Sequence, residues 1–88
     1  MLRFEWDERK ATVNAKKHGI SFEEASTVFN DPNGVLLFDT EHSDDEDRYL
    51  LLGMSDRARL LIVCHVDRGV VRIISARKAT ATEAKNYG

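Results

Sequence analysis

The sequence predicts an α+β fold in which helices pack on a twisted antiparallel sheet. Two features of the sequence support this prediction. The Ser/Thr-x-x-Glu spacing of a capping box occurs at Ser21 and at Thr80, and each marks the start of a helix. Between them, apolar and β-branched runs separated by short turns predict consecutive strands. With one short strand and one more helix at the N-terminus, the expected order is β-α-α-β-β-β-β-α.

The N-terminal part of the chain predicts a strand followed by two helices. Apolar and charged residues alternate from Leu2 to Trp6, as in a strand. Asp7 caps a helix that runs to about His18, and Gly19 suits the position after it because glycine enters the left-handed region without strain. The helix that starts at Ser21 presents an apolar face made by Phe22, Ala25, Val28 and Phe29.

Turn residues divide the rest of the chain into four strands. The second helix ends at Asp31-Pro32, because the residue before proline is pushed out of the α region, and Asn33-Gly34 then forms a turn. The polar, mostly acidic segment Thr40–Asp47 is either a loop or one helical turn. Short turns at Asp56–Ala58 and Asp67–Gly69 indicate an antiparallel meander. The predicted strands are Val35–Phe38, Arg48–Ser55, Arg59–Val66 and the run that begins at Val70.

The stretch Val70–Glu83 is expected to hold the central strand. Its β-branched run favours an extended strand, and Thr80 then starts a short terminal helix. Since side chains alternate across a regular strand, Arg72 and Arg77 are expected on opposite faces. The strand would therefore carry cationic groups at the end where we expect the functional site.

Length and composition limit the class of protein. The 88 residues make one domain, 1–88, just large enough for a single core, and a hydrophobic fraction of 42% is typical of a globular protein. The single cysteine, Cys64, excludes an internal disulfide and favours a reducing compartment. No apolar run approaches the length of a membrane span, and the N-terminus lacks the apolar region of a signal peptide. We therefore expect a cytoplasmic protein.

The charge of the chain is unevenly distributed. A net charge of −2 argues against a generic nucleic-acid binder. However, residues 1–47 carry 12 acidic and 5 basic side chains, whereas residues 48–88 carry 3 acidic and 8 basic ones. The C-terminal half could therefore face phosphates. Ordinary scatter combined with one acidic loop is the alternative explanation.

Arginine is the residue type that stands out as a source of chemistry. Arg68 lies in a hairpin turn, and four other arginines lie at or inside predicted strands, namely Arg48, Arg59, Arg72 and Arg77. A guanidinium can hold two phosphate oxygens at once and stabilise the negative charge of a transition state. The alternative is that these arginines only pair with acidic neighbours on the surface.

Histidine adds one candidate, and the chain offers no cofactor motif. His42 lies in the acidic segment near Glu46 and Arg48 and could transfer protons, although it could also be an ordinary exposed histidine. The histidines lie far apart, and no Cys-x-x-Cys, P-loop or Gly-x-Gly-x-x-Gly motif occurs, so neither a metal nor a nucleotide cofactor is expected. Cys64 and His65 would project to opposite faces of a strand, which argues against a nucleophile pair.

Several sequence blocks together resemble the BrnT-type toxins. They follow one another in the same order over nearly the whole chain, so the resemblance lies in the whole set of blocks. The blocks are FEWD at Phe4–Asp7, Asn14 with KHG at Lys17–Gly19, SFEEA at Ser21–Ala25, Val28-Phe29 with Asp31-Pro32, His42-Ser43 with Glu46 and Arg48, and RIISARKAT at Arg72–Thr80.

The resemblance implies a ribonuclease toxin of a type II toxin–antitoxin pair with a RelE-like fold. It also implies neutralisation by a small BrnA-type antitoxin of the ribbon-helix-helix kind, with DNA contacted only through that antitoxin and no membrane partner. The implied catalytic residues are Arg77 and Arg48 on the phosphate and His42 or Glu46 in proton transfer. The implied RNA-binding residues are Arg59, Arg68, Arg72 and Lys78.

The implied reaction needs no metal. A 2′-OH of single-stranded RNA attacks the adjacent phosphate and leaves a 2′,3′-cyclic phosphate and a 5′-OH end. Two other classes stay open. The chain may instead be a binding module that grips an acidic partner, or an inactive toxin retained within an antitoxin–repressor complex.

Overall fold

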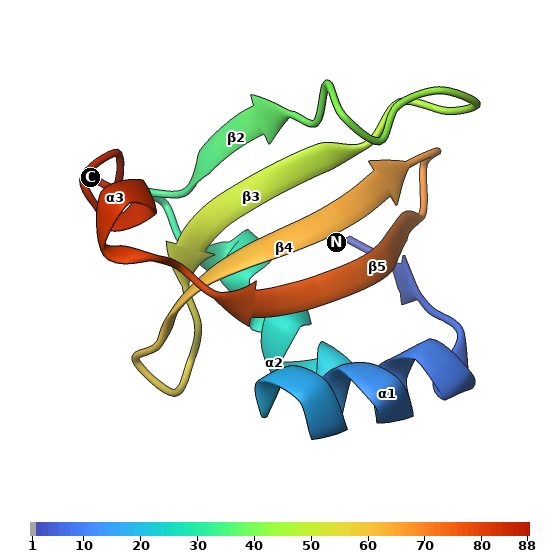
Figure 1. Ribbon diagram of the computed structural model, residues 1–88, viewed down its shortest axis with the longest axis horizontal. Helices are drawn as coiled ribbons and strands as arrows, with labels where there is room; N and C mark the ends of the chain where they lie inside the picture. The colour runs from blue at the N-terminus through green and yellow to red at the C-terminus, as the bar shows by residue number, and fades with distance from the viewer. Residues whose placement is uncertain (1) are drawn as a thin grey trace.

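The structure, a computed structural model that describes residues 2–88, confirms the α+β class. One five-stranded sheet has the strand order β1-β5-β4-β3-β2. Helices α1 and α2 lie on one side of it, and α3 lies beyond the end of β5 (Figure 1). Within residues 2–88, no helix combines the length and apolar character needed to cross a membrane. The elements are β1 (Phe4–Glu5), α1 (Glu8–His18), α2 (Phe22–Thr27), the 3₁₀ helix η1 (Val28–Asn30), β2 (Val35–Phe38), β3 (Tyr49–Met54), β4 (Leu60–Asp67), β5 (Val71–Lys78) and α3 (Ala81–Ala84).

The sheet is mixed, so the prediction of a wholly antiparallel sheet is wrong for one strand. β1 pairs in parallel with β5, with Phe4 opposite Val71, whereas the other three pairings are antiparallel. The parallel pairing is possible because two helices and three strands separate β1 from β5 in the sequence. The middle strand is β4 rather than β5, and its residues Leu61–Val66 are all buried. Apolar side chains on both faces fit β4 for this position.

Hydrogen bonds confirm the predicted helix caps. Asp7 accepts from two backbone N–H groups of α1 at 2.8 and 3.2 Å, and Ser21 accepts from one of α2 at 3.0 Å. Thr80 and Glu83 form both halves of the capping box of α3. Gly19 ends α1 in the left-handed conformation, with φ at +70°. The second helix is shorter than predicted because its last turn tightens into η1.

The hydrophobic core lies between the helices and one face of the sheet. Its fully buried members on the helix side are Ile20, Phe22, Ala25 and Val28. From the sheet, β4 and β5 contribute Leu61, Val63, Ile73 and Ala76. Burying one such large apolar side chain stabilises the fold by about 1.5–3 kcal/mol. This face of the sheet therefore serves stability and leaves the opposite, open face for chemistry.

A bulge in β5 decides where its arginines point. The register between β4 and β5 skips Ile74 directly after the pair Cys64–Ser75. Because paired residues share a face of the sheet, the bulge turns Arg72, Ser75 and Arg77 all toward the open face. The prediction that Arg72 and Arg77 lie on opposite faces is therefore wrong, since it assumed regular pairing.

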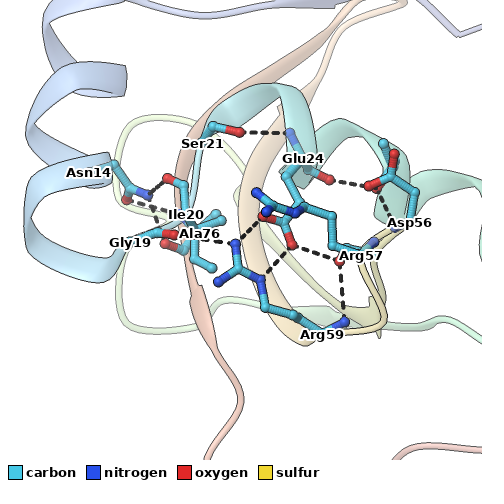
Figure 2. Close-up of polar contacts among 11 residues, drawn as sticks. Asn14, Gly19, Ile20, Ser21, Glu24, Asp56, Arg57, Arg59 and Ala76 are labelled. Atoms are coloured by element: carbon cyan, nitrogen blue, oxygen red, sulfur yellow. Dashed lines mark hydrogen bonds and ion pairs between the residues drawn. The ribbon is translucent and has the colours of Figure 1, made fainter.

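Asn14 joins helix α1 to β5. Its side-chain Nδ2 donates to the carbonyl of Ala76 at 2.8 Å, and its Oδ1 accepts from the N–H of Ala76 at 3.1 Å. The same Nδ2 donates to the carbonyl of Ile20 at 3.0 Å (Figure 2). The buried amide thus satisfies backbone groups at the edge of β5 that β1 does not reach. This contact fixes α1 close to the bulge.

Candidate active site

A cavity of about 270 Å³ opens on the face of the sheet that the helices leave free. We call it the open-face cavity. His42, Arg48, Ser75 and Arg77 supply polar groups to its wall, and its apolar floor is formed by Leu50, Ile62 and Cys64. The structure thus brings together three of the four side chains for which a catalytic role is predicted. The fourth, Glu46, does not line the cavity.

The loop between β2 and β3 positions His42 and Arg48. It is closed at its base, where the N–H of Asp39 donates to the carbonyl of Arg48 at 2.9 Å. The Ser43 hydroxyl donates to the Asp39 carbonyl and accepts from the N–H of Arg48 at 2.9 Å. The acidic segment is therefore a loop anchored at the cavity rim, rather than a helical turn.

Asp39 is a site residue for which the sequence predicted no role. It is buried, and its carboxylate lies 3.1 Å (Oδ2) and 3.3 Å (Oδ1) from Nδ1 of His42. The Cys64 thiol lies 3.9 Å from Oδ2, and burial, followed by the Asp39 charge, raises the pKa of Cys64, so the thiol stays protonated. Asp39 thereby orients the imidazole and leaves Nε2 free for another partner. The Asp-x-x-His spacing between a strand and a polar loop is the sequence signal that points to this pair.

Arg48 has a buried group without a partner. Its Nε is buried and forms no hydrogen bond with any of residues 2–88. Buried N–H groups in folded proteins almost always have a partner, so an unpaired one needs a reason. Arg48 also lines the open-face cavity, so its buried, unpaired N–H belongs to a guanidinium group at the wall of that cavity.

Arg77 is held in place by helix α3. Its two Nη atoms donate to the two carboxylate oxygens of Glu83 at 2.7 and 2.8 Å. This pairing lowers the pKa of Glu83 to about 2, and the capping bonds with Thr80 add to the effect. The end of β5 and the start of α3 therefore fix the guanidinium at the wall of the cavity.

None of the four predicted RNA-binding residues lines the open-face cavity. Arg68 pairs with Glu46 at the outer side of the loop, and Arg72 pairs with Glu5 at 2.7 Å. Arg59 binds Glu24 beside α2, as Figure 2 shows. Lys78 is exposed at the end of β5, opposite the core residue Leu61.

The arrangement suits chemistry at an anion. Two guanidinium groups face a cavity with a carboxylate-oriented imidazole at its rim. Such a set can hold a phosphate and move a proton next to it. Among residues 2–88, no group of three or more histidine, cysteine or acidic side chains is placed to hold a metal ion.

Comparison with known proteins identifies the family. The family described as "Ribonuclease toxin, BrnT, of type II toxin-antitoxin system" matches residues 6–83. The crystal structure of the Brucella abortus ribonuclease toxin BrnT is similar in fold, with a TM-score of 0.69 and 23% sequence identity over 91% of this chain and 99% of that one. No curated protein matches the sequence. Because the family match spans most of its length, the chain belongs to the BrnT family of ribonuclease toxins of type II toxin–antitoxin systems.

Proposed function

We propose that the chain is a metal-independent endoribonuclease that cleaves RNA by attack of a 2′-OH on the adjacent phosphate. The observation that carries the proposal is the convergence of His42, Arg48 and Arg77 on the open-face cavity. Arg48 holds a phosphate oxygen through its guanidinium group, and Arg77 stabilises the charge that gathers on the other oxygens. Arg72 shares the open face, where it pairs with Glu5.

In this proposal His42 transfers the proton. Asp39 fixes its Nδ1, so Nε2 can accept the proton of the 2′-OH or return one to the leaving 5′ oxygen. Glu46 is the alternative base, and it is less well supported because it pairs with Arg68 outside the cavity. Arg59 is not assigned to RNA, since it pairs with Glu24 and, unlike Arg77, does not line the open-face cavity.

The test is cleavage of RNA by the purified, antitoxin-free protein in EDTA. We expect products with 2′,3′-cyclic phosphate and 5′-OH ends, identified by end-group analysis. Arg48→Ala, prepared in the same way, should lose the activity, which excludes a contaminating nuclease. Arg57→Ala, which changes an exposed arginine in the β3–β4 turn, should keep it, which shows that the loss is specific to Arg48. Cleavage that requires added magnesium, or that persists in Arg48→Ala, would contradict the proposal. The binding-module and inactive-toxin alternatives predict no cleavage at all.

The antitoxin that the family implies is, in our proposal, of the BrnA ribbon-helix-helix type, and the pair acts in the cytoplasm. The edge strand β2 supports an obligatory protein partner, since it exposes Leu36, Leu37 and Phe38 at an unpaired sheet edge. An uncharged apolar edge is normally covered. Co-expression with a BrnA-type protein should restore growth and give a complex that copurifies. Equal growth with and without that protein, at matched toxin levels, would argue against the pairing.

A further inference from the structure

Helix α1 borders a second hollow, which no predicted site residue lines. This hollow, the α1 groove, lies between α1 and the edge of β5 and has a volume of about 350 Å³. Its apolar surface includes Val13 and Ile74. Its charged or titratable lining residues are all basic, namely Arg9, Lys10, Lys17 and His18.

The α1 groove adjoins the open-face cavity. Ile74, the residue skipped at the bulge in β5, and its neighbour Ser75 line both hollows. Asn14 fixes α1 against the neighbouring Ala76, so the two hollows keep a constant spacing. A chain that leaves the cavity over the bulge enters the groove directly.

The basic side chains of the groove form no close ion pairs within the described part of the protein. Arg9, Lys10 and Lys17 form no ion pair with any of residues 2–88. The two acidic residues at the start of α1 are already engaged. Asp7 caps the helix backbone, and Glu8 accepts from the indole N–H of Trp6 at 3.0 Å. The groove therefore presents positive charge to whatever lies in it.

The other side of the open-face cavity has the opposite charge. There, the hollow beside His42 and Arg48 is lined by four carboxylates, those of Glu41, Asp44, Asp45 and Glu46. A polyanion held in the cavity is repelled on this side and attracted on the α1 side. The open-face cavity itself is smaller than the pockets of about 300 Å³ or more that hold whole small molecules, so a bound strand must continue outside it.

We propose that the α1 groove binds the RNA strand that flanks the cleaved phosphate. This inference rests on the ribonuclease function proposed above and adds the path of the substrate. Lys10 and Lys17, seven residues apart on one helix face, pair with successive backbone phosphates. Val13 and Ile74 contact ribose and base surfaces between them. Recognition of this kind favours single strands and is tolerant of sequence.

The test compares a long and a short substrate in two matched double variants. Lys10→Gln/Lys17→Gln removes two groove charges, and Lys16→Gln/Lys85→Gln removes two exposed charges that do not line it. For a 12-nucleotide single-stranded RNA, the groove variant should raise KM about tenfold with kcat nearly unchanged. The slope of log KM against log salt should fall by about 1.4, the value for two lost single-strand phosphate contacts. A dinucleoside monophosphate, which is too short to reach the groove, should be cleaved equally by both variants and the wild type.

A binding measurement separates this inference from the proposed activity. A labelled 12-nucleotide 2′-O-methyl RNA, which cannot be cleaved, should bind the groove variant about tenfold more weakly than the control variant. If the groove variant binds this strand more weakly than the control variant does, but the wild type cleaves no RNA, the catalytic proposal fails and the groove stands. If the groove and control variants bind and cleave the 12-nucleotide strand alike, or if the groove variant loses only antitoxin binding, the groove does not hold RNA.

Discussion

Arg59 and Arg77 each bind a glutamate through two nitrogens, but their surroundings differ. Arg59 holds Glu24, whose side chain is only 3% exposed and also accepts from the Ser55 hydroxyl at 2.7 Å. Arg77 holds Glu83, its own side chain is 39% exposed, and it lines the open-face cavity. In both pairs the guanidinium lowers the pKa of the carboxyl group. The same kind of ion pair is therefore part of a buried network at Arg59 and borders an open cavity at Arg77.

The difference teaches that the neighbours of an ion pair, rather than the pair itself, indicate its role. Glu24 accepts hydrogen bonds from both Ser55 and Arg59, and this network joins α2 to the turn before β4 (Figure 2). In the cavity that Arg77 lines, Arg48 contributes a guanidinium whose Nε has no partner among the described residues. Removing Arg59 should therefore affect folding, and removing Arg77 should affect chemistry.

The largest expected effect is on cleavage, in Arg77→Ala. Loss of one preorganised charged donor typically lowers the rate about a hundredfold or more. Its pair with Glu83 is partly exposed, so the free energy of unfolding should fall by about 1 kcal/mol at most. Arg77→Lys should fail to restore activity, because lysine lacks the planar fork. RNA cleavage and thermal unfolding, measured on the same samples, check both statements.

Arg59→Ala is the control for this variant. It should cleave RNA at the wild-type rate per folded molecule and unfold at a lower temperature, since Glu24 stays buried without its cation. A fully active Arg77→Lys would show that Arg77 does not hold two phosphate oxygens. In that case Arg48 would become the main phosphate ligand.

Local signals in the sequence were sufficient to predict most of the fold. Capping residues and turns act within a few positions of the chain. The helix starts at Asp7, Ser21 and Thr80 could therefore be predicted from the sequence. The parallel pairing of β1 and the skipped Ile74 depend on contacts between distant segments, which no local pattern encodes. The bulge matters most for function, because it turns Arg72 and Arg77 to one face.

The site could be predicted only in part, for the same reason. Residue type and the family resemblance pointed to His42, Arg48 and Arg77, which the fold brings to one cavity. The sequence could not separate Arg59 from Arg77, since both lie at strand ends and their partners come from other elements. The sequence did not indicate a binding role for Lys10 and Lys17, because basic residues on a helix are usually only solvated.

The second prediction concerns the buried pair. Glu24→Gln keeps the size of the side chain but removes the charge that binds Arg59, so the free energy of unfolding should fall by about 2 kcal/mol. For a domain of this size the melting temperature should drop by roughly 10 °C. Glu23→Gln, at the exposed neighbouring position, should change it little. Equal melting temperatures for the two variants would show that the Glu24 network does not stabilise the fold.

The smallest expected effect is the acid dependence of the Arg77–Glu83 pair. Because the pKa of Glu83 is lowered from 4.5 to about 2, its contribution to stability is complete above pH 4.5 and is lost as the pH falls toward 2. The pair is partly exposed, so this contribution should be about 1 kcal/mol. Urea unfolding of wild type and Glu83→Gln should therefore differ at pH 6 and converge near pH 2. Burial lowers the pKa of His65, which adds an earlier loss of stability below pH 6.5 that both proteins share. A difference between the two proteins that stays constant from pH 6 to pH 2 would show that α3 is held by its capping bonds and not by the charge on Arg77.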